Sequence, residues 1–291
     1  MIMKKFLLVI FFKLCLIFAD RGLIPINPGI AIFEPNQRAM ICWNGKEEIL
    51  LLSTDLSASD STMVLEILPL PSEPKVKKGD LETFQRAVNL INKRIYISKK
   101  RDGGRLSEGT IPPPAEITFH EKIGAHDISV VHLKEGKGFV DWVRNYLKSL
   151  DFDKEIISDA QKELVESYIS EGFTYFVFDV VTLNKDKKTL EPIQYHFQTE
   201  KLFYPLKITK LGSGYTTIEL IILTPRLLSS FSGISIKRIQ LAHDPITINQ
   251  YDLKIIDEDM SELLKDYTEM KLRVWKIEGE LNSFDKDLIT Q

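Results

Sequence analysis

The sequence predicts an α+β fold, in which antiparallel sheets carry a few segregated helices and a signal peptide precedes them. Segments rich in β-branched and aromatic residues recur along the chain, and Asn44-Gly45 between two of them is a strong hairpin signal. Amphipathic helical patterns fall between groups of these segments instead of alternating with each one. Of the 291 residues, 44% are hydrophobic and 27% are charged, which is enough for one large core or two small ones.

The N-terminus has the pattern of a secretory signal peptide. Residues 1–5 provide a basic start, and residues 6–19 are apolar apart from Lys13. A membrane-spanning helix needs about 20 apolar residues, and this run stops short at Asp20. We therefore expect cleavage after Ala19 and a secreted or extracytoplasmic mature chain. An uncleaved N-terminal anchor is the alternative, because Lys13 interrupts the run and the small-residue cleavage site is imperfect.

Cysteine content and charge limit the covalent and electrostatic options. Loss of the signal removes Cys15 and leaves Cys42, so no disulfide within the mature chain is expected. Cys42 stands beside Trp43 among strand-forming residues, which predicts a buried, unreactive thiol. The formal charge of −3 becomes more negative once the lysines of the signal are removed, so we expect no nucleic-acid partner. Membrane contact is expected only through an uncleaved N-terminal segment.

The first part of the mature chain, residues 20–97, has the pattern of a β-rich lobe with one helix. A strand, the tight turn described above and a second strand come first. A third strand over 63–68 meets Pro69, which lacks the N–H that a central ladder needs, so the strand must end or become an edge there. Asp80 then caps a helix over 81–94. The apolar face of this helix consists of Phe84, Val88 and Ile91.

Residues 98–116 separate this lobe from an α+β lobe over 117–291. The separating segment is polar and Gly-rich and contains three consecutive prolines, so we expect an exposed loop or linker. In the second lobe, Ser158 and Gln161 predict a capping box, and Gly172 predicts the end of the same helix. The other elements expected are a strand over 126–133, helices over 138–150 and 257–267, and strands over 173–183, 192–199, 201–211, 215–223 and 270–281.

Several segments occur together in one order along the chain. They are "NQRAMICWNGKEEILLLS", "EILPLPSEPKV" leading into "GDLETF", "HDISVVHL" with "FVDWVRNYL", "YISEGFTYFVFDVV" and "LFYPLKIT". In this order the chain resembles the exported-protein family known as domain of unknown function 2330 (DUF2330), from about Arg21 to Pro225. The resemblance implies an extracytoplasmic location, no assigned activity and no catalytic motif. Many bacterial members have paired cysteines soon after the signal, which this chain lacks.

The stretch Phe119–His132 is the one candidate for a metal site, because His120-Glu121 stands near its start and His126 follows. Zinc-protease helices place two histidines four residues apart on one face, with a glutamate beside the first. Here the spacing from His120 to His126 is six residues, and Gly124 between them disfavours a helix. In an extended chain six residues span roughly 20 Å, too far for two ligands of one zinc ion.

We therefore expect no metal and no cofactor, and interpret His120, Glu121 and His126 as surface or hydrogen-bonded side chains. The stretch should enter a strand after a turn or bulge at Gly124. The alternative is a tight turn at Gly124 that folds His120 onto His126, where Glu121 or Asp127 could complete an open metal site.

No catalytic residue is predicted from a linear motif. The chain lacks G-x-S-x-G, His243-Asp244 before Pro245 predicts a turn, and Asp257 and Asp259 predict a helix start. We expect a non-enzymatic extracytoplasmic protein that binds or scaffolds an unknown envelope or extracellular protein or ligand. The alternative is a secreted hydrolase whose site assembles in space. A deep pocket with converging polar groups would favour the hydrolase, whereas an exposed apolar patch or an open strand edge would favour the binding protein.

Overall fold

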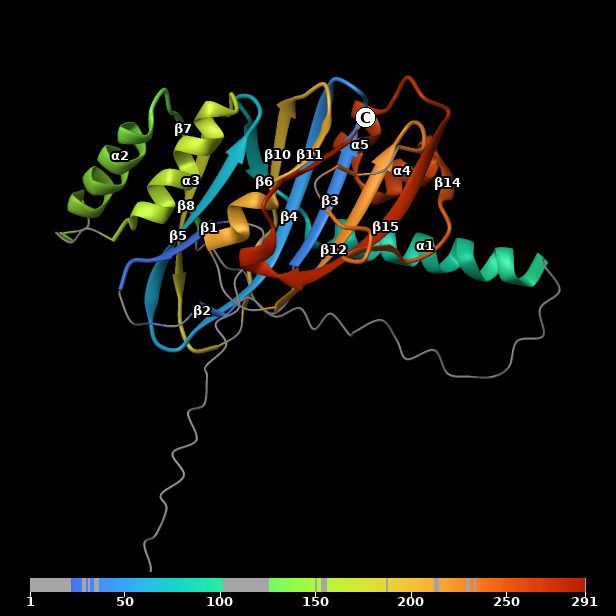
Figure 1. Cartoon of the computed structure of the whole chain (residues 1–291). Helices are drawn as coiled ribbons and strands as arrows, with labels where there is room; N and C mark the ends of the chain where they lie inside the picture. Colours follow the sequence, from blue (N-terminus) through green and yellow to red (C-terminus); the bar gives the residue numbers. More distant parts are fainter. Residues whose placement is uncertain are drawn as a thin grey trace, which may run out of the picture.

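The computed structural model describes residues 22–27, 30, 32–33, 37–101, 126–149, 151–152, 156–186, 188–211, 215–228, 231–232 and 234–290. The predicted signal peptide, 1–19, and most of the predicted linker, 98–116, therefore lie outside the described residues. The described part forms two main sheets, a two-stranded ribbon and five α-helices (Figure 1). Strand pairing is mostly antiparallel and the helices are segregated from the strands, which confirms the predicted α+β fold class.

The smaller main sheet has four antiparallel strands. In spatial order they are β1 (Gly22–Pro25), β5 (Thr62–Leu70), β8 (Tyr175–Leu183) and β7 (His126–His132). β5 and β8 are central and almost fully buried, whereas β7 forms one edge of the sheet.

The larger sheet is ordered β13-β15-β12-β3-β4-β10-β6, and three short strands pair beside this path. β12 pairs in parallel with β3, whereas β4 pairs antiparallel with both β3 and β10. The strands of this path are β3 (Gln37–Trp43), β4 (Glu47–Ala58), β6 (Lys75–Lys78), β10 (Ile193–Gln198), β12 (Tyr215–Thr224), β13 (Ile239–Leu241) and β15 (Glu269–Glu280). The short strands are β2 (Ile32–Phe33) and β9 (Lys188–Thr189) beside β4, and β14 (Ile246–Asn249) beside β15. The separate ribbon pairs β11 (Leu202–Tyr204) with β16 (Leu288–Thr290).

The helices cover the sheets in two groups, at opposite ends of the molecule in Figure 1. Side chains of α2 (Gly136–Ser149) and α3 (Asp159–Ser170) form a core with β5 and β8. Those of α1 (Leu81–Arg101), α4 (Gln250–Ile256) and α5 (Glu258–Leu263) form another with the central strands of the larger sheet. Two 3-10 helices complete the fold, η1 (Lys207–Leu211) and η2 (Leu281–Ser283). None of the described helices is long and apolar enough to cross a membrane.

A third core joins the two main sheets to each other. Leu68 of β5 and Val177 of β8 belong to the same buried cluster as Ile41, Leu50 and Tyr195 of the larger sheet. Alternate residues of β5 and β8 therefore face this shared core, while the others face α2 and α3. Both faces of the four-stranded sheet are thus covered, which explains the nearly continuous apolar sequence of its central strands.

Several local predictions for the first part of the chain are confirmed. β3 and β4 form the expected hairpin, and Gly45 adopts a φ of 101° that its turn requires. Cys42 is fully buried, and this burial raises the pKa of its thiol. β5 continues through Pro69, where it pairs with β8 but not with β1, because β1 pairs only with residues 64–67. Pro69 therefore lies at an edge position, where its missing N–H breaks no ladder.

The helix ends predicted from capping residues are also confirmed. Ser158 and Gln161 form both bonds of the expected capping box, and Gly172 follows α3 with a φ of 94°. The buried side of α2 consists of Gly136, Phe139, Val143 and Leu147. α1 is longer than expected: it ends at Arg101, so residues 98–101 of the predicted loop are helical.

One of the predicted strands was wrong in its extent. The strand expected over 201–211 is β11 followed by Pro205 and η1, because proline cannot donate the next ladder hydrogen bond. The segments 20–97 and 117–291, over which two lobes were expected, contribute strands to the same sheets. Strands from both parts alternate in each main sheet, with β5 beside β8 and β3 between β4 and β12. These pairings bury apolar strands that neither part could cover by itself.

Candidate functional site

The three candidate metal ligands have different outcomes. His120 and Glu121 lie outside the described residues. His126 is the first residue of β7, and its Nδ1 lies 2.7 Å from Oδ2 of Asp179 on β8. The two side chains are 9% and 2% exposed, so His126 is a buried, carboxylate-bonded histidine. Among the described residues, no group of three or more His, Cys, Asp or Glu side chains is placed to hold a metal ion.

A second buried carboxylate lies next to this pair. Glu66 of β5 stands directly opposite Asp179 in the sheet register, and each residue is only 1% exposed. Their neighbours Leu68 and Val177 belong to the core between the sheets, so the two acids face the same side. Three titratable side chains from three adjacent strands therefore meet on the inner face of the four-stranded sheet.

The His126–Asp179 pair has half of the arrangement used in acyl transfer. A carboxylate at one ring nitrogen orients the imidazole, and the other nitrogen must receive a proton from a nucleophile. Here Nε2 of His126 is buried and forms no hydrogen bond with any described side chain. No described serine, threonine or cysteine is thus in position to be activated by this histidine.

β7 forms an edge of the four-stranded sheet, so one side of its backbone faces away from β8. Leu133 N donates to Thr174 O at 2.7 Å just beyond the strand, so these opposite residues form a hydrogen-bonded pair. Hydrogen-bonded and non-bonded pairs alternate in an antiparallel ladder, which makes residues 127, 129 and 131 the bonded positions along β7. The backbone N–H and C=O groups of His126, Ile128, Val130 and His132 therefore point away from β8. Within the described part of the chain, no strand pairs with that side.

Side chains hold β7 firmly although its outer edge is open. His132 stacks on Tyr175 of β8 with ring centroids 4.6 Å apart. On the other face, Asp127 accepts a hydrogen bond of 2.8 Å from Tyr146 of α2. Burial and the negative charge of Asp127 raise the pKa of Tyr146 to about 12. Val130 remains 40% exposed, so an apolar side chain lies at the centre of the edge.

The other described sheet edges are shorter or protected. β6 is four residues long and contains Lys75, Lys77 and Lys78, and charged side chains of this kind protect an edge from further pairing. β1 and β14 have four residues and β13 has three. β7 has seven residues, including neither lysine nor proline. It is therefore the edge best suited to accept another strand.

A charged hollow of about 630 Å³ lies between β6, β10 and α5. Its main charges compensate one another: Asp259 accepts hydrogen bonds from Lys77 and from Gln194. Burial alone would raise the pKa of Asp259, but these two bonds lower it below its ordinary value. His196 Nε2 also lies 3.7 Å from a carboxylate oxygen of Glu47. This mutual pairing favours a structural role for these charges.

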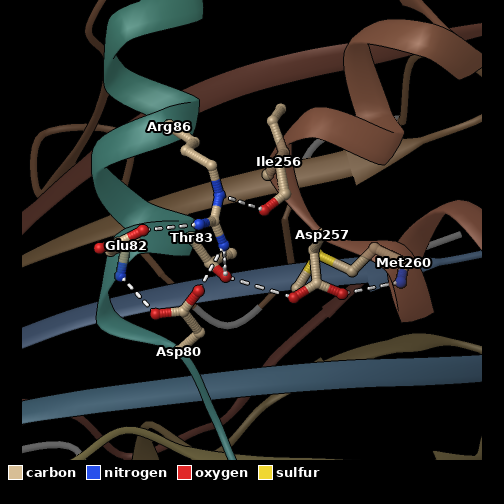
Figure 2. A network of polar contacts seen from close by, with 7 residues as sticks. All are labelled: Asp80, Glu82, Thr83, Arg86, Ile256, Asp257 and Met260. Carbon is tan, nitrogen blue, oxygen red and sulfur yellow. Dashed lines mark hydrogen bonds and ion pairs between the residues drawn. The ribbon is translucent and has the colours of Figure 1, made fainter.

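A polar network joins the start of α1 to the end of α4, as Figure 2 shows. Asp80 accepts from Glu82 N at 2.9 Å and from Arg86 Nη2 at 2.6 Å, which caps α1 as predicted. Arg86 also donates through Nε to Ile256 O at 2.9 Å, which satisfies a carbonyl in the last turn of α4.

The same network continues into α5 (Figure 2). Thr83 donates to Asp257 at 3.3 Å, and Asp257 accepts from Met260 N at 3.0 Å as the N-cap of α5. Burial raises the pKa of Asp257, although the bond from Met260 lowers it. The role predicted for Asp257 at a helix start is confirmed, and Asp259 lies in the first turn of the same helix. The network connects helix ends, which favours a structural role for these residues.

The buried acids are recognisable in the sequence, although they belong to no motif, because each one interrupts an apolar strand. Asp179 interrupts the apolar run "YFVFDVV" and Glu66 interrupts "MVLEIL", each at an inward-facing position of a central strand. A charged residue in such a run is rarely buried without a partner. Its partner could not be named from sequence, because His126 lies 53 positions from Asp179.

Comparisons with solved structures give low similarity. The crystal structure of baculovirus P35 is 11% identical, with a TM-score of 0.41 over 92% of this chain and 99% of that one. A mutated baculovirus P35 after caspase cleavage and the caspase-8/P35 complex each give 10% identity and a TM-score of 0.39. Both comparisons cover 88% of this chain, with 99% and 96% of the respective P35 chains.

Similarities of this size carry no conclusion about function. A search among curated proteins finds no match to the sequence. The family comparison is different, because the match spans residues 21–230 and thus most of the chain. The protein therefore belongs to the family described as "Uncharacterized protein conserved in bacteria (DUF2330)", as its sequence segments indicated.

Proposed function

We propose that this chain is an exported, non-enzymatic binding protein that accepts an extended polypeptide as an additional strand beside β7. The observation that supports the proposal is the open, seven-residue edge of β7, whose backbone groups at alternate positions have no partner strand among the described residues. The basic start and apolar run of residues 1–19 support export. The partner would be an envelope or extracellular protein.

Strand addition suits this edge because unpaired N–H and C=O groups supply affinity while side chains supply selectivity. An added strand would place alternate side chains beside Ile128 and Val130 on one face, and beside Ser129 and Val131 on the other. Cross-strand pairs of β-branched or aromatic residues stabilise such contacts. The partner segment should therefore have apolar side chains at every second position, with a basic residue opposite Asp127.

Peptides displayed at random and selected on the purified chain would test this proposal. Val130→Pro removes an outward N–H without removing a bond to β8, whereas Val130→Thr keeps the N–H and a β-branched side chain. We expect selected peptides to bind Val130→Pro at least about tenfold more weakly, and Val130→Thr within about threefold of the original. Equal binding to Val130→Pro, or no selected peptide at all, would contradict the proposal.

The hydrolase is the second candidate, favoured only by the buried His126–Asp179 pair. A fluorophosphonate probe, which labels activated serine residues, should leave the chain unlabelled because Nε2 of His126 has no hydroxyl partner among the described side chains. Stoichiometric labelling that disappears in His126→Ala, with unchanged circular dichroism, would instead support an enzyme.

A further inference from the structure

A second hollow, of about 670 Å³, lies where several strands end. Its apolar lining includes Phe173 before β8, Phe203 of β11 and Ile289 of β16. The rings of Phe173 and Phe203 are in contact, with centroids 5.1 Å apart. A volume of this size suits a small organic ligand, and aromatic walls offer it a large apolar contact.

Two lysines stand at the mouth of this hollow. Lys46 belongs to the turn between β3 and β4, and Lys201 to the connection between β10 and β11. Neither forms an ion pair with a described residue, and one carboxylate, that of Glu200, lines the same mouth. The mouth therefore presents two ammonium groups and a single carboxylate, which favours a ligand with a negative charge.

Among the described side chains, Glu47 and Glu48, which follow Lys46 in the sequence, form no ion pair with either lysine. Glu47 accepts a hydrogen bond of 2.7 Å from Gln198, and Glu48 accepts one of 2.8 Å from Phe203 N. Glu48 is fully buried, and burial raises its pKa well above the ordinary value of a glutamate. Its carboxyl is thus directed to the protein interior and is held closer to its neutral form.

Hydrogen bonds also hold the segments around the mouth in place. Ser72 donates to Gln198 O at 2.8 Å and accepts from Gln198 N at 2.9 Å. Thr199 N donates to Lys46 O at 2.8 Å, and Trp43 Nε1 donates to Thr199 O at 3.1 Å. The two segments that carry the lysines are therefore tied to each other, so little ordering is needed when a ligand enters.

We infer that this hollow binds a small monocarboxylate with an aromatic or short aliphatic body. The body would lie on Phe173, Phe203 and Ile289, and the carboxylate would reach Lys46 and Lys201 at the mouth. Lysine holds a carboxylate as a point charge without fixed geometry, so the apolar body determines the orientation of the ligand. No described residue of β7 lines this hollow, so the inference does not rest on strand addition there.

Calorimetric titration of the purified chain with octanoate and with 3-phenylpropionate tests the inference. We expect one site per chain with a Kd on the order of 0.1–1 mM, and binding that weakens as salt is added. Octan-1-ol and octylamine, which share the apolar body but not the negative charge, should bind at least about fivefold more weakly.

Variants locate the binding. Lys46→Ala combined with Lys201→Ala should raise the Kd for octanoate about tenfold. Lys254→Ala, at an exposed lysine on α4, should leave it within about twofold. Phe173→Ala should weaken octanoate and 3-phenylpropionate together by removing part of the apolar lining. The inference is overturned if neither acid binds, if the alcohol binds as tightly as the acid, or if the double lysine variant binds unchanged while circular dichroism shows it folded.

Discussion

Replacement of Asp287 by asparagine should change how the stability of the protein depends on pH. Asp287 is 6% exposed and precedes β16. Its Oδ1 accepts hydrogen bonds from the hydroxyl of Tyr168 at 2.8 Å and from Lys207 N at 2.7 Å. Burial raises the pKa of Asp287 to about 6, although both bonds lower it. The ammonium of Lys207 is hydrogen-bonded to Glu171, so its positive charge offsets only part of the effect of burial on the pKa of Asp287.

The sign and size of the expected change in stability with pH follow from the pKa of Asp287. Because its folded pKa is higher than the 3.8 expected without burial, the folded state holds the proton more tightly between pH 4 and pH 6. The contribution of Asp287 to the free energy of unfolding should therefore be highest below pH 4 and fall as the pH rises toward and past 6. A difference of roughly two pH units corresponds to a loss of about 3 kcal/mol by pH 7.

In the Asp287→Asn variant, the asparagine side chain would keep an oxygen acceptor for Tyr168 and Lys207 and would carry no charge. Its amide N–H groups can change the level of stability by about 1–3 kcal/mol if they lack partners, but they do not titrate. The assay is urea unfolding of both proteins at pH 4, 5, 6 and 7, because their difference cancels the groups that they share. We expect the original protein to lose about 2 kcal/mol relative to Asp287→Asn between pH 4 and pH 7, because part of the full loss has already occurred at pH 4. A difference that does not vary with pH would refute the reasoning.

Three further predictions concern packing and accessibility. Phe139→Ala should lower the free energy of unfolding by about 3–5 kcal/mol in urea unfolding, because Phe139 is fully buried on the inner side of α2, whereas Phe139→Leu should cost clearly less. Gly79→Ala should cost about 1–3 kcal/mol in the same assay, since an added Cβ would lie 2.3 Å from Leu51 and 3.1 Å from a backbone oxygen; an unchanged midpoint would show that this contact relaxes. Limited trypsin digestion followed by mass spectrometry should find the first cut within residues 98–114, whose sequence combines basic residues with glycine and proline, and a first cut within β8 would contradict this.

Local structure was predictable where the signal is local. The turn at Asn44-Gly45, the capping box at Ser158 and the helix stop at Gly172 each depend on residues only a few positions apart. Strand neighbours were not predictable in this way, because β3 pairs with β12 across nearly two hundred positions and local patterns contain no information about such partners.

The candidate site was also predictable only in its local features. The strand character of β7 follows from its alternating sequence, and it was predicted. The position of β7 at an edge depends on the order of the strands in the sheet, and hence on the whole fold. The contact between His126 and Asp179 depends on the same order. The same dependence explains why β11 pairs with β16 near the end of the described chain instead of continuing past Pro205.

Amide hydrogen exchange along β7, measured by NMR with and without a selected peptide, tests strand addition most directly. In the free chain, the amides of Ser129 and Val131 should exchange slowly because they bond to β8, whereas those of Ile128 and Val130 should exchange fast because they point outward. Added peptide should slow exchange at Ile128 and Val130 and leave the other two unchanged. Protection of Ile128 and Val130 in the free chain, or bound peptide that leaves their exchange fast, would contradict strand addition at this edge.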